Sequence, residues 1–429
     1  MRKLGIGMVG CGVVGGGVLA HLTRNRDLLQ ERSGVDFEVV RVAVRDLQKA
    51  RGIEASKLTT SWREVVEDPQ VNLVVEMMGG TTLAREVAEA TLKAGKPLVT
   101  ANKALLAECG EELFALAERN KVPIYFEASV AGGIPILKAL REGLRANHIL
   151  GIHGIINGTC NYILSRMADE GKSYEEILLD AKRLGYAEAD ESLDVDGIDA
   201  AHKAAILASL AYGFWVRMDQ VYVEGIRKVS ALDMCFAKKL GYTIKLLATI
   251  QPNSERAVEV RVHPTLIPST HVLASVSGAY NAIAVEGDVV GNTLFYGRGA
   301  GPDATASAVL SDMAEAGIAL DAGCVYRGFE RHSFNGQTVP MAEVRTRYYF
   351  RLTVLNKPGV LARVAALFGA HDLGISSVFQ PEDHDEETVP LVILLDYGKE
   401  SSMRKAYDEI MKLDVVQTPC QMIRVEDFS

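Results

Sequence analysis

The sequence lacks the features that mark a secreted, zinc-binding or membrane-spanning protein. Its six cysteines are scattered along 429 residues and form no C-x-x-C pair, so neither a zinc site nor a disulfide framework is indicated. No uninterrupted apolar stretch approaches the ~18 residues that cross a bilayer. The N-terminus also lacks the hydrophobic region of a signal peptide. We therefore expect a soluble protein of the reducing cytoplasm with no membrane partner.

Positive charge is also in short supply, because 46 Lys and Arg face 55 Asp and Glu, giving a net charge of −9. A phosphate backbone attracts basic surfaces, so nucleic acid is not expected as a partner. Hydrophobic residues make up 48% of the chain and charged residues 24%, as in an ordinary globular protein. At this length two or three domains are expected.

The first third of the chain alternates short apolar segments with amphipathic stretches. We expect strands at 4–9, 37–44, 71–76, 97–100 and 124–126, and helices at 13–25 and 83–94. Buried strands separated by helices are typical of a doubly wound parallel sheet. The pattern predicts an α/β protein whose first domain, residues 1–130, is of the Rossmann type.

Beyond residue 130 the pattern changes. Helices are expected at 137–144, 162–170, 174–184, 198–212 and 304–316, and strands at 258–262 and 272–276. We interpret residues 131–332 as an α+β catalytic and dimerisation domain, with 304–320 packing back on the nucleotide domain. The polar stretch 333–347 is interpreted as a linker.

Residues 348–429 have a pattern of their own. We expect strands at 348–355, 375–380, 389–395 and 420–425, and helices at 360–370 and 401–413. This β-α-β-β-α-β order is typical of a ferredoxin-like module.

The N-terminal region contains a G-x-G-x-x-G motif, Gly10-Cys11-Gly12-Val13-Val14-Gly15. The first glycine permits a tight turn, the second lets the backbone approach a pyrophosphate, and the third packs helix on strand. Helix N-terminal amides would then face the negative charge. Between a strand and a helix, the motif favours a dinucleotide site at Gly10, Gly12, Val13, Val14 and Gly15 over a structural turn.

The end of the second expected strand bears on the choice of cofactor. It reads Ala43-Val44-Arg45-Asp46, and an acidic residue here would hold the ribose 2′-hydroxyl of NAD. Arg45 instead suits the 2′-phosphate of NADP. We favour NADP, although Asp46 leaves NAD open and a solvated basic rim is the simpler interpretation of Arg45.

Three further clusters join ionisable residues to glycines or small residues. Lys103 follows a strand that should end at the carboxyl edge of the sheet, where ligands gather. Asp199 and Lys203 stand four residues apart in an acidic segment and share a helix face. The loop at Asn157 opens a helix whose amides suit a carboxylate or phosphate.

Hydride transfer between an alcohol and an aldehyde needs a proton donor and acceptor at the oxygen, and lysine can serve. Glu188 is placed to bind a substrate ammonium. The plainer alternatives are a surface lysine at position 103 and a weak helical ion pair between Asp199 and Lys203. The acids and glycines around them favour a substrate pocket.

Together these motifs resemble homoserine dehydrogenase over nearly the whole chain. The matching segments are Gly10–Gly15, Thr100–Lys103, Asn157–Leu164, Gly185–Asp190, Leu193–Asp199, Gly241–Leu247 and Tyr296–Gly301. The resemblance implies NAD(P)H-dependent, reversible reduction of L-aspartate 4-semialdehyde to L-homoserine, in threonine, methionine and isoleucine biosynthesis.

The resemblance also implies roles for single residues. Lys203 and Lys103 would be the acid/base lysines. Glu188 and Asp199 would bind substrate, and we add Asp194, Thr159 and Tyr186 to that set. Gly185 and Gly301 would line the cofactor together with Lys103. Ala304 stands where relatives often have proline, which touches no proposed catalytic role.

A monovalent cation site, for sodium or potassium, is implied by the segment Glu127 to Ile134. Its ligands would be the Glu127 carboxylate and the carbonyls of Val130, Gly132 and Ile134. Oxygen ligands suit a hard cation. A structural loop without an ion is the alternative.

The C-terminal module resembles an ACT domain through Leu355-Asn356-Lys357-Pro358-Gly359-Val360-Leu361. Such domains bind small amino acids near this turn, between paired domains. The implied effector site is Asn356, Gly359, Val360 and Leu361, the implied effector is threonine, and the implied assembly is a homo-oligomer, dimer or tetramer. A dimerisation module without ligand is the alternative. We expect a chain cut after Arg347 to keep its activity and lose threonine inhibition.

Two other functions stay open at this point. Another two-domain amino-acid or semialdehyde dehydrogenase would share the cofactor motif, and a phosphorylating one would need a reactive cysteine, for which Cys160 is the candidate. A non-catalytic sensor of a dinucleotide and an amino acid would have no need of Lys103, Glu188, Asp199 and Lys203.

Overall fold

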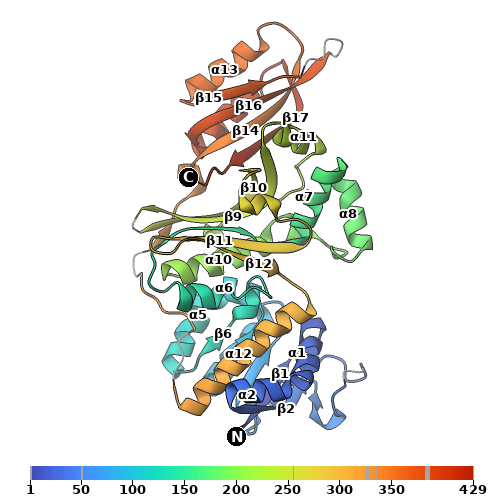
Figure 1. Cartoon of the computed structure of the whole chain (residues 1–429), viewed down its shortest axis with the longest axis vertical. Coiled ribbons are helices and arrows are strands. Elements are labelled where there is room, and N and C mark those ends of the chain that lie inside the picture. The colour runs from blue at the N-terminus through green and yellow to red at the C-terminus, as the bar shows by residue number, and fades with distance from the viewer. Residues whose placement is uncertain are drawn as a thin grey trace. The chain divides into compact units, whose positions relative to one another are not determined.

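The computed structural model describes residues 2–49, 52–254, 256–324, 328–333, 336–381 and 387–428 (Figure 1). The chain forms two compact units. The first comprises Met1–Ile152, His202–Val221 and Asn281–Gln337, and the second comprises His153–Ala201, Tyr222–Tyr280 and Thr338–Ser429. Each unit is assembled from segments that are distant in sequence, and the domain boundaries predicted at 130 and 332 stay predictions. Among the described residues, no helix is both long and apolar enough to cross a membrane.

The first unit contains a six-stranded parallel sheet in the order β3-β2-β1-β4-β5-β6. Its strands are β1 (Arg2–Val9), β2 (Val35–Ala43), β3 (Leu58–Thr59), β4 (Leu73–Glu76), β5 (Leu98–Thr100) and β6 (Ile124–Tyr125). The order reverses between β1 and β4, and ligands of doubly wound sheets bind at the carboxyl ends of strands beside such a reversal. The predicted Rossmann-like sheet is confirmed.

Helices cover this sheet, and one of them comes from late in the chain. Figure 1 shows α12 (Pro302–Ala322) beside α1 (Val13–Arg24), against which it packs. Buried Ala306 and Val309 of α12 share one core with Ile6 of β1. Gly17 allows the close approach, because a Cβ there would lie 2.9 Å from the Pro302 carbonyl. The remaining helices of this region are α2 (Arg26–Ser33), α3 (Trp62–Glu67), α4 (Thr82–Lys93) and α5 (Lys103–Asn120).

The second unit is built on a mixed sheet, in which β9, β10, β17, β14, β16 and β15 follow one another. The first two strands, β9 (Tyr242–Ser254) and β10 (Ala257–Pro268), pair antiparallel. β17 (Val416–Val425) joins β10 in parallel, so the C-terminal strands continue the sheet. The helices of this unit are α7 (Gly158–Glu170), α8 (Tyr174–Arg183), α9 (Ser192–Val195) and α11 (Ala231–Lys239). β7 (Ile149–Ile155) and α10 (Ile198–Tyr212) contain residues of both units.

The C-terminal module, residues 345–428, has the element order β-α-β-β-α-β. Its elements are β14 (Arg345–Leu355), α13 (Val360–Ala370), β15 (Ile375–Phe379), β16 (Thr388–Lys399), α14 (Glu400–Ile410) and β17. Its sheet runs β17-β14-β16-β15, with every pair antiparallel. Phe350, Phe368 and Met403 are buried in a single core between helices and sheet.

Several segments differ from the sequence-based expectation. Residues 272–276, predicted as a strand, instead form the 3-10 helix Val272–Ser275, which the His271 side chain caps by accepting from the Leu273 amide. The predicted linker 333–347 contains β13 (Gln337–Thr338) and the start of β14. The helix predicted at 137–144 is present over 136–143, but only α6 (Ile136–Lys138) is α-helical and Ala139–Gly143 continues it as a π-helix. Helix α2 was not predicted, because its short sequence is mostly polar.

Candidate active site

The turn after β1 has the shape that a dinucleotide pyrophosphate requires. Gly10 has φ +95°, and a Cβ there would lie 2.7 Å from the Met77 carbonyl. A Cβ on Gly15 would lie 2.8 Å from the Gly10 carbonyl. A Cβ on Gly12 would meet no atom within 4 Å, and Gly12 stands at the N-terminus of α1, whose first turn contains no acidic residue. The backbone therefore faces open space with amides suited to an anion.

A buried acid organises the neighbouring loops at the carboxyl edge of the sheet. Glu76, the last residue of β4, is fully buried, and its burial raises the pKa of its carboxyl group. Its carboxylate accepts hydrogen bonds from the Met78 amide at 2.7 Å and from the Thr100 hydroxyl at 2.7 Å. The Asn102 amide donates in turn to the Thr100 Oγ1 at 3.0 Å. Sequence reasoning missed Glu76, although an acid ending a buried apolar run was a usable signal.

These loops place Lys103 at the start of a helix. Asn102 caps α5, because its Oδ1 accepts from the Leu105 amide at 3.1 Å, while its Nδ2 donates to the Gly80 carbonyl at 2.7 Å. Lys103 is the first residue of α5 and is partly buried. Arg45 lies two residues beyond β2 and is exposed. Gly301, with φ +116°, stands before the first turn of α12.

The second unit joins two predicted substrate carboxylates through one amide. Asn157, the cap of α7, donates from Nδ2 to Asp194 Oδ1 at 2.7 Å and to Asp199 Oδ2 at 2.8 Å. Its Oδ1 accepts from the Cys160 amide at 2.8 Å. Asp199 is buried and Asp194 is partly buried. Asn157 was placed in a promising loop by the sequence, but its role as the link between the acids was not foreseen.

Thr159 and Tyr186 belong to the same cluster. The Thr159 hydroxyl lies 2.9 Å from the Tyr186 carbonyl and 3.0 Å from Asp194 Oδ2. The Tyr186 ring stacks on Tyr162, with centroids 4.3 Å apart. Glu188 is exposed and has no hydrogen-bond or ion-pair partner among the residues that the structure describes. We call Asn157, Thr159, Tyr186, Asp194 and Asp199 the carboxylate cluster.

Helix α10 carries the predicted acid/base lysine. Asp199 and Lys203 lie one turn apart on this helix, and both side chains are buried. A buried ammonium is costly unless it is paired or hydrogen-bonded. Gly185, predicted beside the cofactor, adopts φ +77° in the loop after α8.

The predicted cation loop contains a buried carboxylate, that of Glu127. Glu127 accepts from the Leu137 amide at 3.0 Å and from the Lys138 amide at 2.8 Å. Burial, followed by the charge of nearby Asp312, raises its pKa to about 7. Asp312 accepts from the Glu127 amide at 2.8 Å, and its own burial raises its pKa to about 7. Buried acids suit a hard cation, and Glu127 belongs to the same segment as the other predicted ligands, the carbonyls of Val130, Gly132 and Ile134.

Comparison with known proteins decides the family. The profile "Homoserine dehydrogenase, NAD binding domain" matches residues 10–127, and the profile "Homoserine dehydrogenase" matches residues 135–314. Homoserine dehydrogenase of Neisseria gonorrhoeae is 42% identical over the whole of both chains. The solved homoserine dehydrogenase of Thiobacillus denitrificans is 43% identical, with a TM-score of 0.95, over 100% of this chain and 99% of its own.

The chain belongs to the homoserine dehydrogenase family.

Membership of the homoserine dehydrogenase family confirms the predicted NAD(P)-dependent oxidoreductase with a small-molecule substrate. A hyperthermophilic archaeal homoserine dehydrogenase, solved in complex with NADPH, is 29% identical over 73% of this chain and 98% of its own, with a TM-score of 0.61. The alternative that relies on Cys160 as a nucleophile has no support, because that thiol is buried and lies 3.1 Å from the Asp194 carbonyl.

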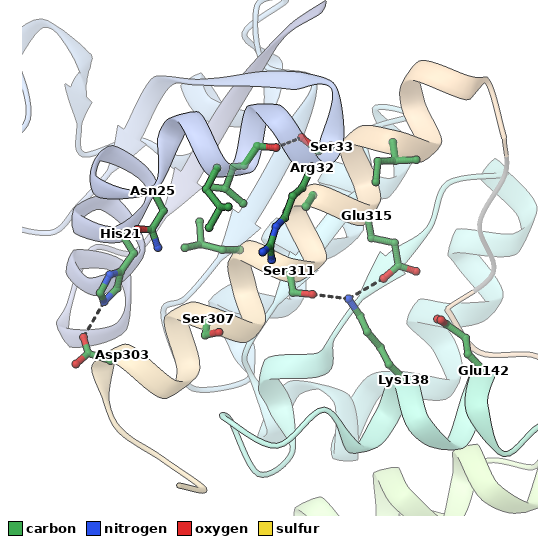
Figure 2. Close-up of a pocket in the computed structure, with 15 residues that line it drawn as sticks. His21, Asn25, Arg32, Ser33, Lys138, Glu142, Asp303, Ser307, Ser311 and Glu315 are labelled. Atoms are coloured by element: carbon green, nitrogen blue, oxygen red, sulfur yellow. Dashed lines mark hydrogen bonds and ion pairs between the residues drawn. The ribbon is translucent and has the colours of Figure 1, made fainter. Parts of the chain in front are cut away.

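A cavity of about 620 Å³ in the first unit is separate from these residues. It lies between α1, α2, α6 and α12, and no predicted site residue lines it. In Figure 2, His21 meets Asp303 at 2.8 Å, and Lys138 reaches Ser311 at 2.8 Å and Glu315 at 2.9 Å. Because none of the predicted site residues lines it, this cavity is not part of the candidate active site.

Proposed function

We propose that this chain interconverts L-homoserine and L-aspartate 4-semialdehyde with NADP, and that the carboxylate cluster binds the amino-acid substrate. The observation that carries the proposal is the side-chain amide of Asn157. Its Nδ2 donates to Asp194 Oδ1 at 2.7 Å and to Asp199 Oδ2 at 2.8 Å, and so holds the two carboxylates close together. Two acids fixed in this way form a site for a cation such as a substrate ammonium. Glu188, exposed and without a partner among the described residues, supplies a further carboxylate.

Lysine side chains are proposed to transfer the proton. When bound, NADP would supply the hydride acceptor for homoserine, and the turn at Gly10, Gly12 and Gly15 would hold its pyrophosphate. Lys203 and Lys103 exchange the proton at the alcohol or carbonyl oxygen, and Asp199, one helical turn away, orients Lys203. The buried setting of Lys203 supports this role, because an ammonium in such a place requires defined partners.

The proposed preference for NADP relies on Arg45. Its exposed side chain follows β2, whose end meets the adenosine ribose in folds of this type. A guanidinium there binds a 2′-phosphate by charge-assisted hydrogen bonds. The archaeal relative solved with NADPH supports the same choice.

A monovalent cation is proposed beside Glu127. The positive charge would compensate the buried carboxyl of Glu127, whose pKa burial raises to about 7. Its neighbour Asp312 already has the Lys138 ammonium at 3.5 Å. Both Glu127 oxygens already accept an amide, yet a carboxylate oxygen has a second lone pair for a cation.

The C-terminal module is proposed as an ACT domain that binds threonine. Its β-α-β-β-α-β order and its antiparallel sheet β17-β14-β16-β15 support a ferredoxin-like fold. At the turn between β14 and α13, Gly359 has φ +86° and Leu361 is 42% exposed. Asn356, Gly359, Val360 and Leu361 would hold the effector between paired modules of a homo-oligomer.

The test is turnover by the purified full chain. We expect homoserine-dependent reduction of NADP, faster than reduction of NAD at equal concentrations, and inhibition by threonine that calorimetry detects as binding. No turnover with homoserine would contradict the proposed reaction. Turnover without threonine binding would remove the proposed effector and leave the reaction standing.

A further inference from the structure

The C-terminal module shares the second unit with the carboxylate cluster, and two buried arginines connect them. Arg351 of β14 is 3% exposed and Arg424 of β17 is 1% exposed. Each side chain leaves the module and pairs with an acid from the segment 222–240, which precedes the module by more than a hundred residues. The two connections are independent of each other.

The first connection is made by Arg351 and Asp233. The guanidinium Nε lies 2.6 Å from Asp233 Oδ1, and Nη2 lies 3.1 Å from Oδ2. The Tyr349 hydroxyl donates to the same carboxylate at 3.1 Å. Asp233 is fully buried at the start of α11, where it also accepts from the amide and hydroxyl of Ser230. Helix α11 packs on α7, the helix that Asn157 caps.

The second connection is made by Arg424. It pairs within the module with fully buried Glu400, and it donates from Nη1 to Glu224 Oε2 at 2.7 Å outside it. Its Nη2 lies 3.1 Å from the Tyr222 hydroxyl, which donates to Glu224 at 3.0 Å. The segment that Arg424 reaches is β8 (Tyr222–Val223) and the residues just after it.

The residues after Glu224 lie directly against the helix that carries Asp194. A Cβ on Gly225 would lie 2.3 Å from the Val195 carbonyl, so only glycine permits the approach. The Ile226 amide donates to the same carbonyl at 2.8 Å, and Arg227 pairs with Asp196. A displacement of Glu224 would therefore be passed to α9.

Buried ion pairs contribute little net stability compared with apolar residues of the same shape. Their geometry is nevertheless strict, since an unmatched buried charge is costly. Arg351 and Arg424 both lead from one module to the two helices, α7 and α9, that meet in the carboxylate cluster.

We propose that Arg351 and Arg424 are positioning residues, through which the C-terminal module holds the carboxylate cluster in its substrate-binding geometry. The proposal rests on the proposed role of that cluster. It predicts, in contrast to the expectation from sequence, that a chain cut after Arg347 loses activity, because the cut removes the guanidinium that fixes Asp233.

The test uses full-length variants and separates substrate from cofactor. Arg351→Met removes the first connection, Arg351→Lys keeps its charge, and Glu224→Gln weakens the second at a side chain that is 33% exposed. The matched control is Arg363→Met, which breaks an exposed ion pair with Asp414 inside the module. For each protein, the KM for homoserine, the KM for NADP, kcat and the melting temperature are measured.

We expect Arg351→Met to raise the KM for homoserine about tenfold and Glu224→Gln to raise it about threefold, in the range of typical coupling between sites. Arg351→Lys should recover part of the loss. The KM for NADP should stay within about twofold throughout, and Arg363→Met should match the wild type. If Arg351→Met does not fold, the KM values of Glu224→Gln and Tyr349→Phe test the proposal instead, because each of these substitutions removes fewer buried interactions.

Folded variants whose KM for homoserine stays at the wild-type value would overturn the proposal, as would equal rises in both KM values. A failure of the proposed function is distinct from these outcomes. In that case the wild type and Arg363→Met would themselves not oxidise homoserine.

Discussion

The two regions proposed to bind cofactor and substrate are built in different ways. The cofactor turn consists of backbone: Gly10, Gly12 and Gly15 set its shape within six residues. The carboxylate cluster is assembled from the start of α7, the loop after α8 that contains Tyr186, and the helices α9 and α10. Arg351 and Arg424, from late in the chain, pair with acids of the segments that contact α7 and α9. A site made of local backbone depends on a few φ angles and clearances. A site made of distant side chains depends on every ion pair that fixes its helices.

Replacement of Lys203 should have the largest effect, and that effect should be on turnover of the substrate and not on cofactor binding. Loss of a general acid/base group lowers kcat by about 10²–10⁴-fold. We expect Lys203→Ala to show such a loss while it binds NADP like the wild type, as measured by fluorescence titration. Near-normal turnover in the folded variant would exclude Lys203 from the proton transfer.

Arg45→Ala should act on the cofactor side and distinguish the two dinucleotides. A charge-assisted contact to the 2′-phosphate is worth about 1.5–3 kcal/mol, so NADP binding should weaken about 10–100-fold. NAD binding should barely change, because NAD lacks this phosphate. Equal losses for both cofactors, measured by titration, would show that Arg45 does not contact the 2′-phosphate.

Gly12→Ala tests whether the cofactor turn functions through its open backbone. A Cβ at Gly12 meets no protein atom within 4 Å, so the fold should be kept, but it occupies the space next to the pyrophosphate. We expect NADP affinity to fall about tenfold, or 1.4 kcal/mol, with the melting temperature unchanged. Gly16→Ala is the control, since its Cβ is equally unhindered one turn into α1. A similar loss of NADP affinity in both variants would show that a change in helix α1 causes it, and not the filling of the space beside Gly12.

The smallest expected effect concerns a charge buried in the second unit, that of Lys245. Lys245 of β9 donates to Asn161 Oδ1 at 3.1 Å and to the Val276 carbonyl, and burial lowers its pKa to about 8. In the unfolded chain this lysine has an ordinary pKa of about 10.4. Above pH 8 it is therefore still protonated in the unfolded chain, while it has lost its proton in the folded chain. Stability therefore rises with pH above the folded pKa.

Between pH 8 and pH 9 this linkage amounts to about 1 kcal/mol. The measurement is denaturant unfolding of the wild type and Lys245→Met at both pH values. The free energy of unfolding of the wild type should gain about 1 kcal/mol relative to the variant over this interval. Parallel curves would show that Lys245 titrates normally in the folded protein.

The contrast between the two regions also explains what the sequence could predict. The G-x-G-x-x-G motif and the period of the strands predict the cofactor turn, because both depend on neighbouring residues. The bounds of α10 and α13 agree with those expected, since each helix has a continuous pattern. The segment 272–276 is a short, mostly apolar run that favours a strand, yet it forms a 3-10 helix capped by His271.

Long-range partners leave no such local pattern. Glu76 stands out as an acid at the end of an apolar strand, but only the fold shows that Thr100 meets its carboxylate. Asn157 could be placed in a loop, yet its link to Asp194 and Asp199 needs three helices to come together. Arg351 and Asp233 are separated by 118 residues, and nothing near either one in the sequence indicates the other.

The most direct test of the separation between the two sites is to measure the KM for homoserine and the NADP affinity of Asn157→Ala. This variant removes the amide that joins Asp194 and Asp199, and hydrogen bonds to charged groups are worth about 1.5–3 kcal/mol each. We expect a rise of at least about tenfold in the KM for homoserine, with NADP affinity within about twofold of the wild type. An unchanged KM for homoserine, or a parallel loss of NADP affinity, would contradict the separation of a backbone-built cofactor site from a substrate site built on the carboxylate cluster.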